Sequence, residues 1–424
     1  MREHAEPIAA AEEIAAAVRA KQKYPQAAVE EAAERVRSGD DGLRAWVCLD
    51  PLAARKALDT GRGDERLAGV PFGVKDLIDV AGLPSALGLS EDEYKPAAAL
   101  RNAAAVQRLE AEGAVALGKT VTSALAFDRP GPTRNPLALE RTPGASSSGS
   151  AAAVAAGMVP LALGSQAVGS VIRPASYCGV WAFVPSRGSV PSEGSLVLSQ
   201  TLDRIGVLAS SPSGLRLAAQ VLCSEADEPA RDGRIAVLAG GELAQRAAEP
   251  SACLARLART SSDTLRPLEL DIDWSAVLEA TRIIAAFEFH AKLDEKRPPI
   301  ASLDMRLIAA LAPARPDEQA YRGALQFGER LTQAWDRAVA DFDAVLLPSA
   351  ADEAPAGPLD DQDPAPAALG SLLGLPAVNV PIFTSRSGLP LGCQLLGRRK
   401  ADLTAVALAA RLASGIAEQE RRHA

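Results

Sequence analysis

Histidine is scarce in this sequence. The chain has three histidines, His4, His290 and His423, and the first and last of them lie near its ends, where residues are poorly ordered unless they are tied down. His290 lies in an apolar-rich stretch of helical pattern, where a lone histidine is more often a packed or capping side chain than a base. Metal sites built on histidine and Ser-His-Asp triads therefore have too few histidines, and any hydrolytic chemistry must use another base.

Closely spaced cysteine pairs and excess basic charge are also missing, and aromatic residues are few. The five cysteines show no C-x-x-C spacing; they are Cys48, Cys178, Cys223, Cys253 and Cys393. We therefore predict neither a disulfide framework nor a zinc site. We expect the protein to reside in a reduced, cytoplasmic setting. Aromatic residues make up 4% of the chain, the net charge is −8 and there is no basic stripe. We expect no nucleic-acid partner, because such binding uses basic patches and base stacking.

Long apolar runs are absent as well. The longest uncharged run of small and apolar residues covers the fourteen positions from Ala151 to Gly164 and is interrupted by Pro160. A helix needs about 20 apolar residues to cross a bilayer. The N-terminal residues mix acidic with apolar side chains and lack the basic region of a secretory signal. We therefore expect no membrane partner and no secretory signal.

The chain does contain an unusual stretch of 31 residues, Thr142 to Ile172, without one Asp, Glu, Lys or Arg, although 23% of the chain is charged. A Ser/Gly turn cluster opens it, small and apolar residues follow, and a second Gly/Ser turn comes before its end. Hydroxyl groups at two turns of a segment apolar enough to be buried suit an enclosed nucleophilic site. A flexible Ser/Gly linker is the alternative, but a linker has no reason to continue into an apolar run.

Helical and strand patterns alternate through the rest of the chain. Helical patterns cover 8–37 (two segments divided near Tyr24-Pro25), 51–60, 98–112, 211–223, 242–260, 274–293, 318–340 and 402–417. Strand patterns cover 45–49, 67–80, 114–117, 180–184, 234–238, 265–270, 344–347, 377–383 and 391–396. This alternation predicts an α/β fold with a large mixed β-sheet that helices cover on both faces.

The predicted strands come from both halves of the chain, so we expect one domain over residues 1–424. It comprises a helical N-terminal arm (1–60), a core that holds the Ser/Gly turns (61–210), a mainly helical part that covers the site (230–340), and returning strands with a C-terminal helix (341–424). Residues 350–366, rich in Pro, Asp and Ala, are predicted to form a surface loop. Whether this loop covers the site stays open.

One motif has a second interpretation. Gly113 to Thr120 matches the phosphate-loop pattern G-x-x-x-x-G-K-[ST] letter for letter. A phosphate loop must follow a strand and open a helix. Here a helical pattern precedes Gly113, and the interior residues read as an apolar strand whose N–H groups pair within a sheet. We interpret the motif as a strand and keep nucleotide binding as the alternative.

Three further motifs place Lys75, Ser146 and Ser170 in a fixed order. They read GVPFGVKD (69–76), TPGASSSGS (142–150) and GSQAVGSVIRPA (164–175), with shorter matching pieces at 118–120, 134–136, 202–206 and 389–392. Together they resemble the lysine strand, the first serine loop and the nucleophile loop of the amidase signature family. Ser146 and Ser170 stand 24 residues apart, the separation that the family motif prescribes, and the likeness covers most of the chain.

The resemblance implies that Ser170 attacks an amide carbonyl and forms an acyl-enzyme, with Lys75 as base and Ser146, which carries a cis peptide bond in the family, as proton relay. A lysine amine accepts a proton only when it is neutral, so its pKa must fall from about 10.4 toward 7–8 by burial. Taken alone, Lys75 has another interpretation, as a side chain that snorkels to solvent beside Asp76.

The family further implies an oxyanion hole formed by the backbone N–H groups of Ala167, Val168, Gly169 and Ser170. Family members commonly read D-T-G-G-S or Q-T-G-G-S, where this chain reads Gln166-Ala-Val-Gly-Ser170. Ala167 removes a hydroxyl that would anchor the loop, and Val168 would be strained in a left-handed conformation. Either the loop tolerates valine, or the hole is distorted and activity is low. We favour an active enzyme, because the three side chains of the proton chemistry are retained.

Arg173 stands three residues after Ser170, where the common motif has arginine two residues after the nucleophile. Together with Gln166, this spacing resembles the malonamidase subgroup, whose arginine binds the substrate carboxylate. Arginine suits that task because it forms two parallel hydrogen bonds to a carboxylate. The alternative is that Arg173 braces the fold through a buried ion pair, for instance with Asp203. Both interpretations stay open.

We therefore predict an amidase that hydrolyses a linear amide C–N bond of a small molecule without metal or cofactor, and a substrate that resembles malonamate. A homodimer stays open. Two competing interpretations remain. A catalytically impaired homologue would share the fold and motifs, and an amidotransferase-type subunit would deliver ammonia to a partner enzyme.

Overall fold

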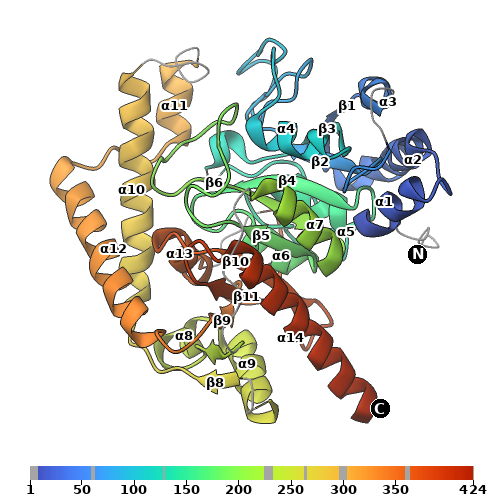
Figure 1. Cartoon of the computed structure of the whole chain (residues 1–424). Helices are drawn as coiled ribbons and strands as arrows, with labels where there is room; N and C mark the ends of the chain where they lie inside the picture. Colours follow the sequence, from blue (N-terminus) through green and yellow to red (C-terminus); the bar gives the residue numbers. More distant parts are fainter. Residues whose placement is uncertain are drawn as a thin grey trace.

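A single mixed sheet forms the centre of the molecule (Figure 1). The computed structural model describes residues 8–58, 63–127, 129–223, 233–261, 265–295, 303–358 and 363–423. Within them the sheet has eleven strands in the order β1-β3-β2-β4-β6-β5-β10-β11-β9-β7-β8. These are β1 (Trp46–Leu49), β2 (Pro71–Lys75), β3 (Val115–Thr120), β4 (Leu161–Gln166), β5 (Trp181–Val184), β6 (Arg204–Ala209), β7 (Ile235–Val237), β8 (Leu265–Pro267), β9 (Ala344–Pro348), β10 (Ala377–Thr384) and β11 (Pro390–Gly397).

The sheet joins the two halves of the chain. β5 pairs with β10, and β2 runs parallel to β3 and β4, whereas β4 and β6 are antiparallel. Pairs of both kinds therefore occur in one sheet, which confirms the predicted mixed α/β class. The division of residues 1–424 into one domain with four parts stays a prediction.

Helices cover both faces of this sheet. They are α1 (Ala11–Arg19), α2 (Pro25–Leu43), α3 (Pro51–Leu58), α4 (Ala104–Ala111), α5 (Ser148–Ala155), α6 (Ile172–Cys178), α7 (Pro212–Leu222), α8 (Gly241–Arg246), α9 (Ala248–Thr260), α10 (Trp274–Asp294), α11 (Met305–Leu311), α12 (Glu318–Ala338), α13 (Ala365–Leu372) and α14 (Asp402–His423). On one face α5 and α6 contact each other and the central strands, and on the other α7 packs against β5 and β6 while α14 packs against β10 and β11. α10 and α12 lie side by side at the left of Figure 1, and α1 to α3 lie at the right.

The N-terminal helices form as the sequence predicts. Ile14 and Val18 of α1 and Val29 and Val36 of α2 are buried, so the apolar positions at helical spacing face the body of the molecule. α2 begins at Pro25, a residue that suits the first turn because that turn has no intrahelical use for the missing N–H. The predicted break near Tyr24-Pro25 is confirmed.

The structure differs from the predicted elements at two strands and four helices. The elements without a counterpart in the sequence-based assignment are β4, β6, α5, α6, α11 and α13. Gly164 of β4 lies opposite Gly206 of β6, and glycine weakens a strand pattern that the neighbouring strands then restore. α13 begins at Ala365, where Pro366 is tolerated in the first turn.

The surface loop predicted over residues 350–366 is therefore wrong in part. Ala350 and Ala354 are buried, and the residues from Ala365 onward belong to the fully buried helix α13. Residues 359–362 lie outside the described residues. Alanine and proline counted as loop-forming in the sequence, but their small apolar side chains also fit a buried helix.

The phosphate-loop match from Gly113 to Thr120 is a strand. β3 covers Val115–Thr120, is buried throughout, and pairs with both β1 and β2. The Val115 N–H donates to the carbonyl oxygen of Val70 at 2.9 Å. The sheet thus uses the N–H groups that a phosphate loop would need, as the strand interpretation requires.

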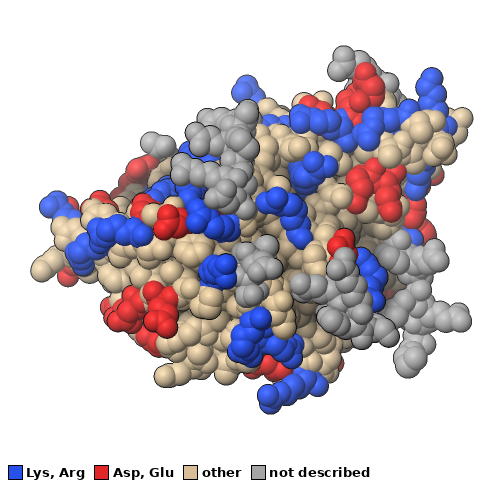
Figure 2. Space-filling model, turned by 60° about the horizontal axis from the view of Figure 1, so that its bottom comes forward, with Lys and Arg blue, Asp and Glu red and all other residues tan. Residues whose placement is uncertain are grey.

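The buried apolar residues form one large cluster, a smaller one, and a third of three residues, Tyr177, Ala350 and Ala354. The large cluster follows the sheet, and the smaller one joins Leu77, Leu198, Phe289 and Ile308 of four separate segments. On the face drawn in Figure 2, basic and acidic side chains are interspersed with uncharged surface. Among the described residues, all five cysteines are free and no helix is long and apolar enough to cross a membrane.

Candidate active site

Lys75 is the last residue of β2, and its side chain is fully buried. Its Nζ lies 2.6 Å from Ser146 Oγ and 3.0 Å from Ser147 Oγ. It also lies 3.0 Å from Ser165 Oγ and 3.1 Å from the Ser165 carbonyl oxygen. The amine is thus surrounded by hydroxyl and carbonyl oxygens, none of which carries a full charge.

Burial changes the acidity of this amine. The loss of hydration lowers the pKa of Lys75 to about 7, and the charge of Asp203 acts in the opposite direction. A lysine with a pKa near 7 is neutral in a large fraction of molecules at neutral pH, which is the condition for a general base. The alternative interpretation, a Lys75 side chain that snorkels to solvent, is wrong, because the side chain has no exposed surface.

Ser146 lies in the loop that leads into α5. The Ala145–Ser146 peptide bond is cis, as the resemblance implies. The next residue, Ser147, donates its backbone N–H to the carbonyl oxygen of Ser170 at 3.2 Å, so the two serine loops are joined directly. Gly164 packs against the same point, since a Cβ on it would lie 2.9 Å from Ser147 Oγ.

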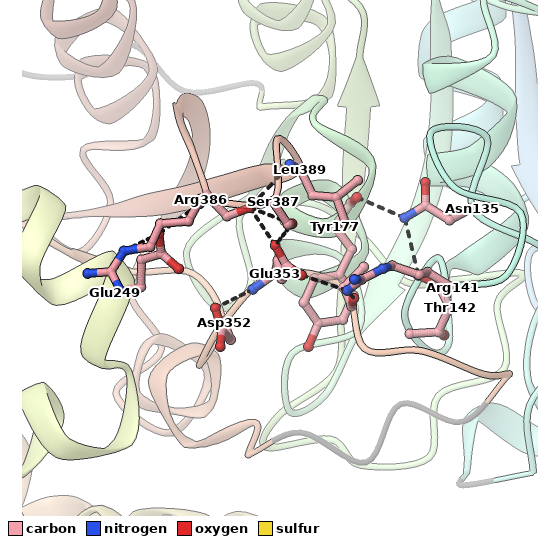
Figure 3. A network of polar contacts seen from close by, with 12 residues as sticks. Asn135, Arg141, Thr142, Tyr177, Glu249, Asp352, Glu353, Arg386, Ser387 and Leu389 are labelled. Carbon is pink, nitrogen blue, oxygen red and sulfur yellow. Dashed lines mark hydrogen bonds and ion pairs between the residues drawn. The ribbon is translucent and has the colours of Figure 1, made fainter.

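The chain before this loop is tied to the C-terminal part of the protein (Figure 3). Arg141 points toward Glu353, and its Nη1 donates to Glu353 Oε1 at 2.7 Å. Asn135 Nδ2 donates to the carbonyl oxygens of Thr142 at 3.2 Å and Tyr177 at 2.9 Å. The first serine loop is therefore anchored both to the 350–358 segment and to the end of α6.

Ser170 lies in the loop between β4 and α6, and a side-chain amide holds this loop. Gln166 Oε1 accepts the N–H groups of Val171 and Ile172, each at 3.0 Å. Gln166 Nε2 donates to Ser371 Oγ of α13 at 3.2 Å. Gln166, known from the sequence only as part of the motif, therefore connects the nucleophile loop to a helix about 200 residues further along the chain.

A buried arginine supports Ser371 in turn. Arg204 Nη2 donates to Ser371 Oγ at 3.1 Å, and Arg204 Nη1 donates to the carbonyl oxygens of Pro185 at 3.0 Å and Leu375 at 2.6 Å. Burial lowers the pKa of Arg204 to about 9. The sequence analysis did not single out this arginine, which braces α13 against the strand next to the nucleophile loop.

The residues assigned to the oxyanion hole form the turn after β4. The N–H groups of Ala167, Val168, Gly169 and Ser170 have no acceptor in the described part of the chain. None of the four residues has a left-handed backbone φ, so the strain expected for Val168 in that conformation does not arise. The valine side chain instead lines the site.

A cavity of about 300 Å³ opens at these loops. Its polar lining comes from Ser146, Ser165, Ser170, Arg173, Asp203 and Arg282, and the rest is apolar, including Leu77, Phe127, Val168, Leu196, Leu198 and Leu311. Leu77 and Leu198 also belong to the smaller apolar cluster, which places the cavity between that cluster and the sheet. The structure thus brings Ser146 and Ser170 to one enclosed space and sets Lys75 directly behind Ser146.

Arg173 and Asp203, the two residues of the ion-pair alternative, both line the cavity. Asp203 Oδ2 accepts the N–H of Leu198 at 2.5 Å and the N–H of Ser199 at 3.2 Å. Burial raises the pKa of Asp203 to about 6. The Arg173 side chain lies against Gly169, since a Cβ added there would be 3.2 Å from Arg173 Nε. Arg173 is thus beside the nucleophile loop, and its role stays a prediction.

The sequence analysis missed three groups of the cavity: Ser165, Asp203 as a member of the site, and Arg282. Ser165 stands in the quoted motif, but only the pairing of β2 with β4 brings it to Lys75. Arg282 lies on α10, far from the motifs. His290 is not among the residues that line this cavity, and its Nε2 lies 2.9 Å from the carbonyl oxygen of Pro313. Among the described residues, no three His, Cys, Asp or Glu side chains form a group that could hold a metal ion.

Comparison with known proteins gives a consistent result. The family profile described as Amidase matches residues 27–247. A glutamyl-tRNA(Gln) amidotransferase subunit of Acidobacterium capsulatum is 29% identical, over 92% of this chain and 95% of that protein. The AtzE subunit of 1-carboxybiuret hydrolase from Pseudomonas sp. is 39% identical over 45% of this chain and 44% of that protein. A crystal structure described as an amidase superposes with a TM-score of 0.81 at 28% identity, covering 96% of this chain and 100% of the other.

Proposed function

Since the chain belongs to the amidase family, we propose that it hydrolyses the C–N bond of a small linear amide through an acyl-enzyme on Ser170. In this proposal Lys75 is the base and Ser146 relays the proton. The observation that carries it is the buried amine of Lys75 within 2.6 Å of Ser146 Oγ, in a site that also holds Ser170.

The hydrogen-bond partners of Lys75 determine how the neutral amine is oriented. A neutral lysine has two N–H groups and one lone pair, whereas a carbonyl oxygen can only accept. The Ser165 carbonyl oxygen at 3.1 Å takes one N–H, and the Ser147 or Ser165 hydroxyl takes the other. The lone pair is then left for the hydroxyl of Ser146, the nearest of the four oxygens.

In the acylation step, the Ser146 hydroxyl gives its proton to Lys75 and takes the proton of Ser170. Ser170 Oγ forms a bond to the amide carbon, and the carbonyl oxygen gains negative charge. The N–H groups of residues 167–170 bind this oxygen, and each such donor contributes about 3 kcal/mol to transition-state stabilisation. The C–N bond then breaks, and the proton returns through Ser146 to the leaving nitrogen, which departs as ammonia or an amine.

Deacylation uses the same groups in reverse. A water molecule attacks the ester carbon while its proton passes to Lys75 through Ser146. The bond between the acyl carbon and Ser170 Oγ breaks, the serine regains its proton, and the carboxylic acid leaves. Each proton taken by the lysine is returned, so the chemistry requires no metal or cofactor.

We propose further that the substrate bears a carboxylate, as malonamate does, which Arg173 binds. Two arginines, Arg173 and Arg282, line a cavity that is otherwise largely apolar, and a guanidinium pairs with a carboxylate through two parallel hydrogen bonds. One relative is a subunit of 1-carboxybiuret hydrolase, and the name of that enzyme describes a substrate with a carboxyl group. Arg173→Lys and Arg282→Gln should raise the KM for carboxylate-bearing amides more than the KM for neutral amides.

A second candidate is an amidotransferase-type subunit that delivers ammonia to a partner enzyme. The relative from glutamyl-tRNA(Gln) amidotransferase supports it, because the similarity covers nearly the full length of both chains. Such a subunit should copurify with its partner and show little activity alone. A catalytically impaired homologue is the third candidate, and the absence of a left-handed Val168 argues against a distorted oxyanion hole.

One experiment separates these candidates. The purified chain and its Ser170→Ala variant are profiled against a panel of amides with and without carboxylates, and against a serine-reactive fluorophosphonate probe. We expect hydrolysis and labelling by the parent chain only. Labelling that persists in Ser170→Ala would identify a different nucleophile, and a parent chain that is labelled but hydrolyses no amide would favour the role in a larger amidotransferase.

We also propose a cytoplasmic location, from the absence of paired cysteines, and no nucleic-acid or membrane partner, with a homodimer as the assembly to test. Light scattering of the purified chain tests the assembly directly.

A further inference from the structure

The sheet brings Lys75 and Asp203 to the same edge. β2 and β4 are parallel and end at Lys75 and Gln166. β6 is antiparallel to β4, and its first residue, Arg204, lies opposite Gln166. Asp203 comes directly before Arg204. Because β6 begins where β2 and β4 end, Asp203 lies at the edge of the sheet where the proposed base is held.

The Asp203 carboxyl group is fixed by one oxygen only. Its Oδ2 accepts the backbone N–H groups of Leu198 and Ser199, whereas its Oδ1 has no hydrogen-bond partner within the described residues. The side chain lines the same cavity as Ser146 and Ser170. Asp203 is therefore a rigidly held acid that faces the space where the substrate binds.

The groups around Lys75 carry no charge, so the charge of Asp203 affects the protonation of the amine. The groups that contact the amine are the hydroxyls of Ser146, Ser147 and Ser165 and one carbonyl oxygen. These oxygens favour the ammonium form only weakly. Among the described residues, Asp203 supplies the charge that favours the protonated amine, and in a low-dielectric site such a charge acts strongly.

We propose that Asp203 is a positioning residue that holds the proton on Lys75, so that the pair of residues, and not the amine alone, determines the pH at which Ser170 is activated. This inference rests on the proposed function, since it assigns a partner to the base of that reaction. Asp203 acts through Lys75 and transfers no proton itself.

The two groups titrate as a coupled pair. Burial raises the pKa of Asp203 to about 6, and burial lowers the pKa of Lys75 to about 7. As the pH rises, the carboxyl group loses its proton first, and its new charge then delays the loss of the proton from the amine. The two apparent steps therefore belong to the pair. An uncharged residue at position 203 removes the delay.

Other charged groups near the pair come from each element packed against it. They are Arg173 on α6, Arg204 on β6, Arg282, Glu288 and Lys292 on α10, and Asp76, which directly follows the end of β2. Lys292 favours the ionised form of Asp203. Glu288 accepts hydrogen bonds from Ser199 and Thr201, so it holds the loop that carries Asp203 without being one of the charges that shift Lys75.

The test measures the rate at which a fluorophosphonate probe labels Ser170 between pH 5.5 and 9, in the full chain and in Asp203→Asn. Asparagine keeps the size of the side chain and an oxygen that can accept the Leu198 and Ser199 N–H groups. We expect the midpoint of the rate profile to move to lower pH. The ratio of the rate at pH 6 to the rate at pH 8.5 should rise by up to about twofold, because the Asp203 carboxyl group is already protonated in about half of the parent molecules at pH 6.

Matched variants separate charge from structure. Glu288→Gln weakens the support of the same loop and should lower the rate at every pH without moving the midpoint. Asp203→Glu keeps the charge and should keep the midpoint close to that of the parent chain. Asp203→Ser supplies a second uncharged residue if Asp203→Asn does not fold, which thermal unfolding would show.

The possible outcomes are distinct. An unchanged midpoint in a folded uncharged variant, or a shift to higher pH, overturns the proposal. If Ser170→Ala is still labelled, the proposed function itself fails. If Ser170→Ala is not labelled while the midpoint of Asp203→Asn stays where it was, the function stands and only the role of Asp203 is lost.

Discussion

Lys75 and Lys119 lie on neighbouring strands, β2 and β3, and neither side chain reaches solvent. Lys119 Nζ lies 3.3 Å from Asp76 Oδ1 and donates to Ser85 Oγ at 2.7 Å. Lys75 contacts only hydroxyl and carbonyl oxygens. Burial lowers the pKa of both lysines, and at Lys119 the carboxylate of Asp76 opposes this effect most strongly.

The comparison shows which surroundings would let a buried lysine act as a base. Two residues of the same type and burial differ in whether a carboxylate touches the amine. The contacting carboxylate of Asp76 makes Lys119 half of an ion pair, whose removal leaves a buried charge without its partner. Lys75 has its carboxylate, Asp203, at the cavity wall, so its proton is held less firmly and can be exchanged.

The largest difference between the two lysines should appear in activity. Lys75→Met removes the proposed base, and we expect the rate of Ser170 labelling at pH 8 to fall by about 10²–10⁴-fold. Lys119→Met should stay within about tenfold of the parent rate per folded molecule, because Lys119 touches neither serine loop. Equal losses in the two variants would mean that the contact with Asp76 does not separate the roles of the two lysines in activity.

Lys119→Met, which should change activity little, should lower stability strongly. Lys119→Met leaves Asp76 buried without its cation, and we expect the free energy of unfolding to fall by about 3–5 kcal/mol in urea denaturation. Replacing both partners, as in Lys119→Met with Asp76→Leu, should recover at least about 1 kcal/mol of this loss. A double variant no more stable than Lys119→Met would argue against the ion pair as the reason for burying Lys119.

The hydroxyl groups around Lys75 should differ among themselves. Ser146→Ala removes the proposed relay, and we expect labelling of Ser170 to slow by about 10²-fold. Ser147→Ala removes a hydroxyl at 3.0 Å from the same amine, and we expect a loss below about tenfold, the effect of one hydrogen bond. Similar losses in both variants would indicate that the hydroxyls only solvate Lys75 and that neither relays its proton.

The last expected effect is the dependence of stability on pH. The folded pKa of Lys75 is about 7, and its unfolded value is about 10.4. Between these values the unfolded chain holds the extra proton, so this residue makes the free energy of unfolding rise with pH, by about 1.4 kcal/mol per unit. The contribution is lost as the pH falls to 7. Urea denaturation at pH 7.5 and 9 should show a steeper rise in the parent chain than in Lys75→Met.

Much of this arrangement could be predicted from the sequence, for a definite reason. The order of the elements follows from local patterns, and the Lys75, Ser146 and Ser170 motifs are contiguous. The strand interpretation of Gly113 to Thr120 was also available, because a strand and a phosphate loop make different use of the same backbone N–H groups.

The remaining parts of the site depend on contacts between distant segments. The local pattern of β4 is weakened by Gly164 and Ser165, and only β2 and β6 beside it define the strand. Asp203 looked like a partner for Arg173, because no local pattern shows that β6 begins beside the end of β2. Ser371 lies in α13, directly after the proline-rich residues 350–366 that the sequence predicts as a loop.

The brace formed by Gln166, Ser371 and Arg204 can form only late in the synthesis of the protein. A nascent chain that has left the ribosome as far as residue 350 already carries every motif serine and the motif lysine. It still lacks α13, and therefore the hydroxyl that receives both the Gln166 amide and the Arg204 guanidinium. A premature stop before Ser371 would thus give a polypeptide with Lys75, Ser146 and Ser170 but without this brace of the nucleophile loop.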